Sequence, residues 1–376
     1  MEPTTASDQV VFDPEELLSS HPIEQPLFAG GVRCHGGFDA DGKYVSPRTA
    51  TRGPAIAAWQ RRHTSAFGTE LLDVGLDAFP GQYPNLAQTR LLLDGGITQP
   101  LISELTRIGT VEGFGAMIRF SNIPDWGTVI DEDITGTSLA HLDRGLFEAH
   151  ARDESGFEGE GGHQQMWYAA RDIAFDHPAT DDQTAVMLER MGLAKPGRGQ
   201  QGVDLELMAR QFEERRLFRT LDWQIESLLE RMIRLMMIEI SAFHIFAWAE
   251  EILADTDRIA GDGEAARLVS YIRSDETPHI EYLKTALTEL RDRTFVGDDG
   301  VRIPGAEVIG AMWDRALAES RGGRRSDFLD LTIGEVTHAL ADRHDADDLL
   351  EQFHALGDVR PDADGTWIDV TTGDRA

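Results

Sequence analysis

The residues best suited to bind a metal ion lie in the stretch Ser274-Asp275-Glu276-Thr277-Pro278-His279. Glu276 and His279 are three positions apart, a spacing that places a carboxylate and an imidazole on one face of an α-helix, one turn apart. Ile272 and Leu283 are apolar neighbours on that face. A carboxylate that points into apolar surroundings needs a partner, because an unpaired buried charge is costly. One such pair can hold one metal ion, and two facing pairs can hold two.

The chain has four Glu-x-x-His pairs, and chance alone also produces this spacing. Two of the pairs have polar helical neighbours, and we expect them to be solvated: Glu335/His338 and Glu351/His354. The other two pairs each follow a long helical stretch with a lone carboxylate in apolar company. The candidate ligands, in chain order, are Glu112, Glu160, His163, Glu239, Glu276 and His279.

Each lone carboxylate has surroundings that call for a cation or a proton donor. Glu239 lies in the most apolar stretch of the chain, and a helix that is apolar all round is a buried helix. Glu112 lies among small and apolar residues. Glu104 is the alternative to Glu112, but Arg107 follows three residues later and the two resemble a surface ion pair. Glu158 is the alternative to Glu160.

The apolar periodicity predicts the helices that position these residues. We expect helices over 54–63, 85–93, 99–120, 160–175, 183–191, 205–218, 221–254 and 265–293, and in the C-terminal part over 304–320, 327–342 and 346–356. The two glycines before His163 weaken the fourth helix unless it begins nearer His163. Pro278 cannot donate a backbone hydrogen bond, so we expect a kink or widened turn between Arg273 and Pro278.

Three segments follow from this pattern. Residues 1–97 form an N-terminal tail, a turn-rich segment and short helices, with poor order expected over 1–27. Residues 98–295 contain all the candidate ligands and form the metal-binding helices. Residues 296–376 form a more polar helical extension.

The amino-acid composition limits the kinds of molecule that the protein is expected to bind. Asp and Glu number 66 against 35 Lys and Arg, a formal net charge of −31. Such a charge argues against nucleic acid and anionic membranes as partners. The single cysteine, Cys34, excludes an internal disulfide. The longest apolar run, 236–249, is too short and too polar for a membrane span. The expectation is a soluble cytoplasmic protein.

The order of the six candidate ligands resembles that of the ferritin-like di-iron carboxylate superfamily. Its members place one Glu on each of two helices and a Glu-x-x-His pair on each of two others. The resemblance covers about residues 98–295. It implies an all-α fold, a ferritin-like four-helix bundle with additional N- and C-terminal helical and loop segments. It also implies that Asp275, which precedes Glu276, accepts a hydrogen bond from a ligand histidine. Gly159 stands at the matching place before Glu160.

The same resemblance implies a cofactor of two Fe ions, with Mn/Fe or Mn as alternatives. Four carboxylates and two imidazoles suit these metals better than zinc, which takes fewer and softer ligands. Tyr168 and Tyr282 either line a pocket beside the metals or pack in the core. His244 lies about 140° round the helix from Glu239 and is expected to be a core histidine.

The function that the resemblance implies is a di-iron oxidase or oxygenase. It would activate dioxygen to oxidise a small or medium organic substrate, with electrons from a ferredoxin or reductase, and a homodimer would be compatible with it. Some arylamine oxygenases have a third histidine four residues before the last Glu, but that position is Ile272 here. The alternatives are a ferritin-like protein that oxidises or stores iron, and a ferritin-like structural or binding module.

Overall fold

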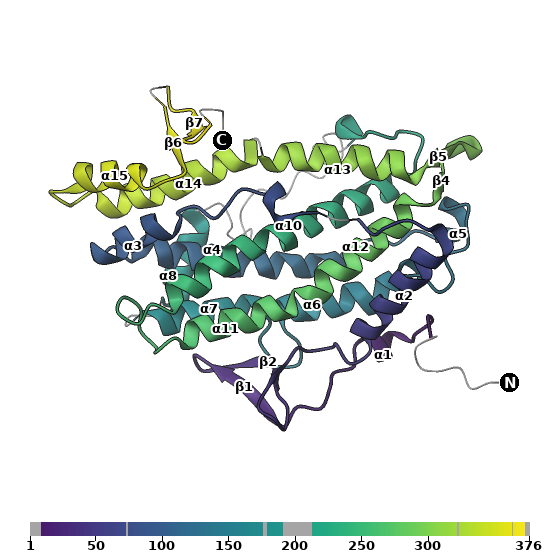
Figure 1. Cartoon of the computed structure of the whole chain (residues 1–376), viewed down its shortest axis with the longest axis horizontal. Coiled ribbons are helices and arrows are strands. Elements are labelled where there is room, and N and C mark those ends of the chain that lie inside the picture. Colours follow the sequence, from purple (N-terminus) through teal and green to yellow (C-terminus); the bar gives the residue numbers. More distant parts are fainter. Residues whose placement is uncertain are drawn as a thin grey trace.

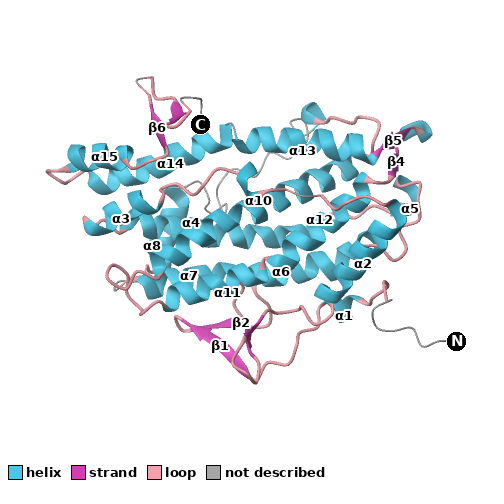
Figure 2. Cartoon of the chain, viewed as in Figure 1, coloured by secondary structure: helices cyan, strands magenta, loops and turns pink. Residues whose placement is uncertain are grey.

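The structure of the chain, a computed structural model, describes residues 9–72, 74–175, 179–190, 213–321, 323–362 and 364–372. It is predominantly helical and its strands are short (Figure 2). The all-α class predicted from the sequence is therefore confirmed at this level. Residues 205–212 of the helix expected over 205–218 lie outside the described part, as do residues 1–8 of the expected tail.

Six helices form the centre of the molecule (Figure 1). They are α4 (Gln99–Gly115), α6 (Glu148–Ser155), α7 (His163–Ala174), α10 (Trp223–Leu253), α11 (Glu264–Asp275) and α12 (Thr277–Arg291). Helix α4 packs against both α6 and α7, α7 packs against α11, and α10 packs against both α11 and α12. This packing lets residues on four separate stretches of the chain meet in the interior.

The long helix α10 runs through two apolar cores and connects them. Its first part, with Leu228 and Met232, belongs to one core together with Leu287 of α12. Its last part, with Phe246, belongs to the other core together with Ile272 of α11. Asp222 caps this helix by accepting a hydrogen bond from the backbone N–H of Gln224 at 2.8 Å. Such a cap satisfies one of the backbone donors that a helix leaves free at its start.

The remaining elements cover this centre. N-terminal to it lie α1 (Pro14–Leu17), β1 (Gln25–Ala29), β2 (Val32–Phe38), β3 (Tyr44–Val45), α2 (Arg52–Phe67) and α3 (Leu86–Asp94). The three strands form an antiparallel sheet in the order β1-β2-β3. Helix α2 packs on α12, and strand β2 contacts α7. The N-terminal segment is therefore packed directly onto the central helices.

Further elements follow α4 and α12. These are α5 (Trp126–Val129), α8 (Asp181–Arg190), α13 (Gly305–Arg321), α14 (Gly323–Leu340), α15 (Ala346–Ala355), and the hairpins β4–β5 (Thr294–Val296, Arg302–Pro304) and β6–β7 (Val359–Pro361, Trp367–Asp369). Helix α13 packs on α10 and α12, and α14 packs on α4, so the C-terminal helices extend over the top of the view in Figure 1.

Residues 9–27, for which the sequence predicts poor order, contact the rest of the structure at Leu17 and at Val10. Leu17 is fully buried and fills the space beside Gly145, where a side chain would collide with it. The backbone carbonyl of Val10 accepts a hydrogen bond from the Trp59 indole at 2.8 Å. These two contacts join the segment to the central part of the protein.

Among the described residues, one helix is long and apolar enough to cross a membrane by length and composition, and this is α10. Of its most apolar window, 61% is buried inside the protein. The core helix of a soluble protein passes the same test, and burial at this level is what such a core helix shows.

Candidate metal centre

Histidines and glutamates from α6, α7, α10 and the α11–α12 junction meet between the two apolar cores. Two groups of four can each present ligand atoms that all lie within 4.8 Å of one another: His150, Glu154, Glu239 and His279, and Glu154, His163, Glu276 and His279. Glu154 and His279 belong to both groups. Two overlapping sets of donors provide two adjacent places for a cation.

One half of the centre forms where α11 meets α12. Helix α11 ends at Asp275, α12 begins at Thr277, and Glu276 is the junction residue. Pro278 in the first turn of α12 lacks the N–H that would continue the first helix, and the helix is broken where the sequence predicted. His279 places Nδ1 2.7 Å from Oε2 of Glu276.

The other half forms where α6 ends and α7 begins. Glu154 lies in the last turn of α6, and His163 is the first residue of α7. The chain between them leaves the helix axis and makes a tight hairpin, in which Phe157 and Glu160 exchange two backbone hydrogen bonds of 3.0 Å. At the tip, Gly159 has a φ of +87°. A glycine adopts this left-handed conformation without steric cost.

The hairpin is joined to strand β2 and carries Glu160 away from the centre. Gly161 donates to the carbonyl of Arg33 at 2.8 Å and accepts from the N–H of His35 at 2.9 Å. The Glu160 carboxylate pairs with the Arg33 guanidinium at 2.8 Å, and both side chains are partly exposed. Glu160 therefore takes no part in the buried cluster.

The prediction of Glu160 as a ligand is thus corrected, and Glu154 occupies its place. Glu158, the alternative, is exposed near the hairpin tip. The physical reason lies in the glycines before His163, which serve a strand-like bridge rather than a helix, so α7 begins only at His163. The sequence did contain a signal: Asp153-Glu154 has the same dipeptide as Asp275-Glu276, and the chain has only one other Asp-Glu.

The aspartates of these two dipeptides each serve the histidine of the opposite half. Oδ2 of Asp153 lies 3.0 Å from Nε2 of His279. Oδ2 of Asp275 lies 3.7 Å from Nε2 of His163. Each aspartate therefore faces one imidazole nitrogen, and the Nδ1 atoms face the cluster. A carboxylate in this position sets the tautomer and orientation of a metal-ligating histidine.

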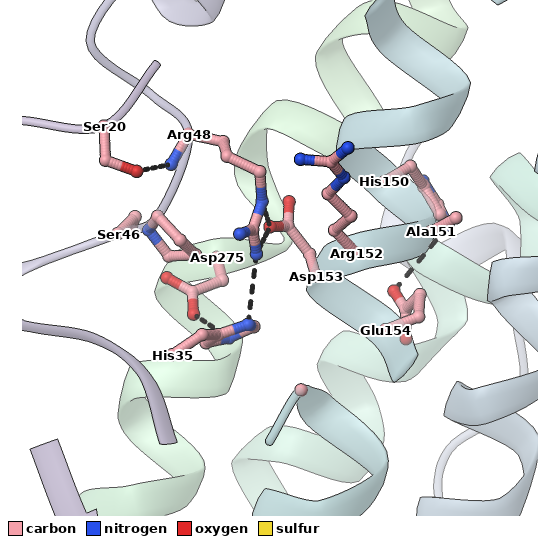
Figure 3. Close-up of polar contacts among 12 residues, drawn as sticks. Ser20, His35, Ser46, Arg48, His150, Ala151, Arg152, Asp153, Glu154 and Asp275 are labelled. Atoms are coloured by element: carbon pink, nitrogen blue, oxygen red, sulfur yellow. Dashed lines mark hydrogen bonds and ion pairs between the residues drawn. The ribbon is translucent and has the colours of Figure 1, made fainter. Parts of the chain in front are cut away.

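A further layer of N-terminal residues holds the aspartates (Figure 3). Arg48 donates from Nε to Asp153 at 2.6 Å, and Arg52 donates from Nη2 to Asp153 at 2.7 Å. Asp275 accepts from the Tyr44 hydroxyl at 2.7 Å and lies 3.1 Å from Nε2 of His35. Burial raises the pKa of Asp153, but the charges of Arg48 and Arg52 outweigh it and hold that pKa well below its usual range.

His150 is a third histidine in the cluster, one turn before Glu154. Its Nε2 lies 3.4 Å from Oε1 of Glu239 and 3.6 Å from Oε1 of Glu154. Its Nδ1 lies 3.3 Å from the hydroxyl of Tyr282. Tyr282 therefore contacts the cluster, and it is also fully buried in one of the apolar cores. Burial lowers the pKa of His150 well below its ordinary value, which favours the neutral imidazole that binds metals.

Glycines on α4 let Glu112 come close to this cluster. A Cβ at Gly115 would lie 2.9 Å from Cγ of Glu154, and one at Gly109 would lie 2.9 Å from Cβ of Trp167. The Trp167 indole donates to Oε1 of Glu112 at 3.2 Å. Tyr168 instead shares a 2.7 Å hydrogen bond with Thr110 on α4. Tyr168 is not among the residues that line the cavity next to Glu112.

The carboxylates of the cluster shift one another's pKa values because they are buried close together. Burial, and then the charge of Glu276, raise the pKa of both Glu112 and Glu239 well above the usual range. Burial also acts to raise the pKa of Glu276, but His163 outweighs it and lowers that pKa to about 2.

The histidines show the complementary effect. Burial lowers the pKa of His163, but Glu276 and Glu154 outweigh it and raise that pKa well above 6.5. Burial likewise lowers the pKa of His279, and Glu276 is the largest of the groups that raise it in turn. The raised pKa values of the two glutamates and the two histidines all show that these buried side chains call for additional positive charge.

Several buried side-chain nitrogen and oxygen atoms at the centre, each of a type that can bind a metal ion, lack a hydrogen-bond partner among the described residues. They are Nε2 of His150, Oε1 and Oε2 of Glu154, Nδ1 and Nε2 of His163, and Oε1 of Glu276. His163 Nδ1 and Glu276 Oε1 are 2.9 Å apart without hydrogen-bond geometry. Unpaired buried polar atoms are rare and costly, and atoms that converge in this way fit a shared cation.

The residues set aside in the sequence lie elsewhere. Glu104 pairs with Arg107, as expected, but the pair is largely buried rather than on the surface. His244 places Nε2 3.2 Å from the carbonyls of Leu76 and Phe79, a partnered histidine outside the cluster. His338 is exposed, and Glu351 is exposed on α15.

Comparison with known proteins returns no match: no protein-family model fits the chain, and neither curated proteins nor solved structures give a similar protein.

Proposed function

We propose that this chain is a ferritin-like four-helix-bundle protein of the di-iron carboxylate type, and that it is an oxygen-dependent oxidoreductase for a small or medium organic substrate. The observation that carries the proposal is the repeated arrangement of Asp-Glu and His across the centre. Asp153 serves His279, Asp275 serves His163, and the glutamates Glu154 and Glu276 lie between the two imidazoles.

The donor set supports two Fe ions, with Mn/Fe or Mn as alternatives. Four carboxylates can offset the charge of two divalent ions, and hard oxygen donors with imidazoles suit Fe and Mn better than zinc. The residues that would hold the metals are Glu112, His150, Glu154, His163, Glu239, Glu276 and His279. When bound, two ferrous ions supply the electrons that reduce dioxygen and so drive oxidation of an organic substrate.

The protein's own part is to orient the ligands and exclude water. Asp153 lies within hydrogen-bond distance of Nε2 of His279, and a hydrogen bond donated by that nitrogen leaves Nδ1 with its lone pair toward the centre. Asp275 faces Nε2 of His163 at 3.7 Å and favours the same orientation by its charge. Arg48 and Arg52 keep Asp153 ionised for that task. The apolar cores on both sides leave the donors in a setting of low dielectric, where their charges act strongly.

An oxidation that consumes one dioxygen and inserts one oxygen atom needs two electrons beyond those of the substrate. We therefore expect an electron donor of the ferredoxin or reductase kind as a partner.

The proposal is tested by loading the metal-free protein with Fe(II) under anaerobic conditions and then admitting oxygen. We expect two irons per chain and oxygen uptake that stops when those two irons are oxidised and resumes on chemical reduction. Uptake of many irons per chain, with a growing mineral, would replace the oxidase with iron storage. If no iron binds, both readings fail and a structural or binding module is left.

A further inference from the structure

A cavity of about 400 Å³ reaches the proposed metal centre from the surface between α4 and α10. Three of its lining residues are proposed ligands: Glu112, Glu154 and Glu239. Its volume is in the range of roughly 300–1,000 Å³ that small-molecule sites have. The cavity is therefore the path by which an organic molecule can come next to the metals.

The walls of this cavity are apolar and partly open to solvent. Phe114, Met117 and Ile238 line it with 46%, 54% and 46% of their surface exposed, and Leu235 lines it from a buried position. Large apolar side chains at a concave opening mark a surface that binds an apolar molecule.

Two arginines of α10 line the same cavity. Arg234 is paired with Glu230 and Glu319, and its Nη1 is buried with no hydrogen-bond partner among the described residues. Arg231 is exposed, and its one described contact is a 3.2 Å hydrogen bond from Nη1 to the Ser121 hydroxyl. Within the described residues no carboxylate lies in ion-pair distance of Arg231.

The position of Arg231 on α10 sets the length of a ligand. Arg231 lies eight residues before Glu239, which is about 12 Å of helix rise and about 80° round the helix. Leu235 lies midway between them and lines the cavity. The cavity thus has a cationic end near solvent, an apolar middle and a carboxylate-rich end at the proposed metals.

We propose that the substrate is an elongated apolar molecule with a terminal carboxylate, held by Arg231 and with its far end at the metal centre. This inference rests on the proposed function in one respect only: that metal ions are bound at the inner end of the cavity. Charge complementarity decides the orientation. The inner end of the cavity is lined by three glutamates, whereas the outer end presents the guanidinium of Arg231, which pairs with no carboxylate among the described residues.

The test is calorimetric binding of decanoate and of decanol, a neutral analogue, to the purified full-length chain. We expect decanoate to bind about tenfold more tightly than decanol, the factor of one charge-assisted contact. The variant R231Q should remove that preference and leave decanol binding unchanged. The control R144Q, which removes an exposed arginine outside this cavity, should bind both probes like the parent.

A second variant tests the location. I238W places a large ring at the cavity wall and should weaken both probes, whereas R231Q should weaken only decanoate. Equal affinities for the two probes in the parent, or unchanged decanoate binding in R231Q or I238W, would overturn the inference. Metal content measured on the same samples separates the two proposals: metals without decanoate binding refute only the substrate class, and decanoate binding without metals refutes only the di-iron function.

Discussion

In one half of the candidate metal centre only Thr277 and Pro278 separate glutamate from histidine, whereas residues 155–162 separate them in the other. Both halves nevertheless place a glutamate at the end of one helix and a histidine in the first turn of the next. The difference shows that the spacing in sequence is not what the site requires. What it requires is a helix break, which Pro278 supplies in one half and a hairpin anchored on β2 supplies in the other.

The two halves also differ in how their aspartates are supported, and this gives the largest expected effect. Asp153 is buried against the guanidinium groups of Arg48 and Arg52, whereas Asp275 contacts Tyr44 and His35. Asp153→Asn should lower the free energy of unfolding of the metal-free protein by about 3 kcal/mol or more, because two buried cations lose their counter-ion. Asp275→Asn should cost about 1–2 kcal/mol, because its partners are hydrogen-bonding groups.

Urea unfolding of the metal-free variants measures both values. Asp143→Asn is the control, since that carboxylate is mostly exposed and should change stability little. Equal losses for Asp153→Asn and Asp275→Asn would show that the arginine pair does not distinguish the halves.

The second prediction concerns the two histidines, one from each half, whose pKa values are raised by the neighbouring carboxylates. The pKa values of His163 and His279 are raised above 6.5, so both imidazoles are protonated at pH 6.5 and below. Metals bind only the unprotonated form, so affinity must fall as the pH falls through these raised pKa values. We expect the combined affinity for two metals to drop by at least about 100-fold per pH unit below pH 6.5, one factor of ten for each histidine proton displaced. Protons displaced from Glu112 and Glu239, whose pKa values are also raised, add to this loss.

Isothermal titration with Mn(II) in buffers of different ionisation enthalpy counts the protons released. A release of two or more near pH 6.5 is expected, and pH-independent binding would contradict the charge arrangement in both halves.

The third and smallest prediction tests the hairpin. A Cβ at Gly162 would lie 2.4 Å from the carbonyl oxygen of Asp153, so Gly162→Ala should cost about 2 kcal/mol and displace Asp153 and Glu154. Gly159→Ala meets no atom within 4 Å and adds only the strain of a positive φ, about 1 kcal/mol. Thermal unfolding with metal analysis compares them, and metal loss in Gly159→Ala alone would reverse the role given to the hairpin.

The sequence was informative where a lone carboxylate stands in an apolar helix. Glu239 and Glu276 come together because burial leaves a carboxylate few alternatives to a cation, and the helical period that places them is local. Pro278 marked the break in α11–α12 for the same local reason. Helix α10 was expected over 221–254 and runs from Trp223 to Leu253.

The residues that the sequence did not reveal depend on contacts distant along the chain. His150 and Glu154 lie in a short, charged helix that resembles a surface segment. They are buried because α4, which approaches closely through Gly115, and α7 pack against this helix. Arg48 and Arg52 meet Asp153 across about a hundred residues. No local pattern encodes such a pairing. The repeated Asp-Glu dipeptide was the one sequence signal that pointed to Asp153-Glu154.

The metal content of the parent chain and of Glu154→Ala and Glu160→Ala, measured by elemental analysis after Fe(II) loading and desalting under anaerobic conditions, tests the central claim most directly. Glu154 is shared by both ligand groups, whereas Glu160 pairs with Arg33 near the surface. We predict two metals per chain in the parent and in Glu160→Ala, and fewer than one in Glu154→Ala. Two metals retained in Glu154→Ala, or metal lost in Glu160→Ala, would contradict the account.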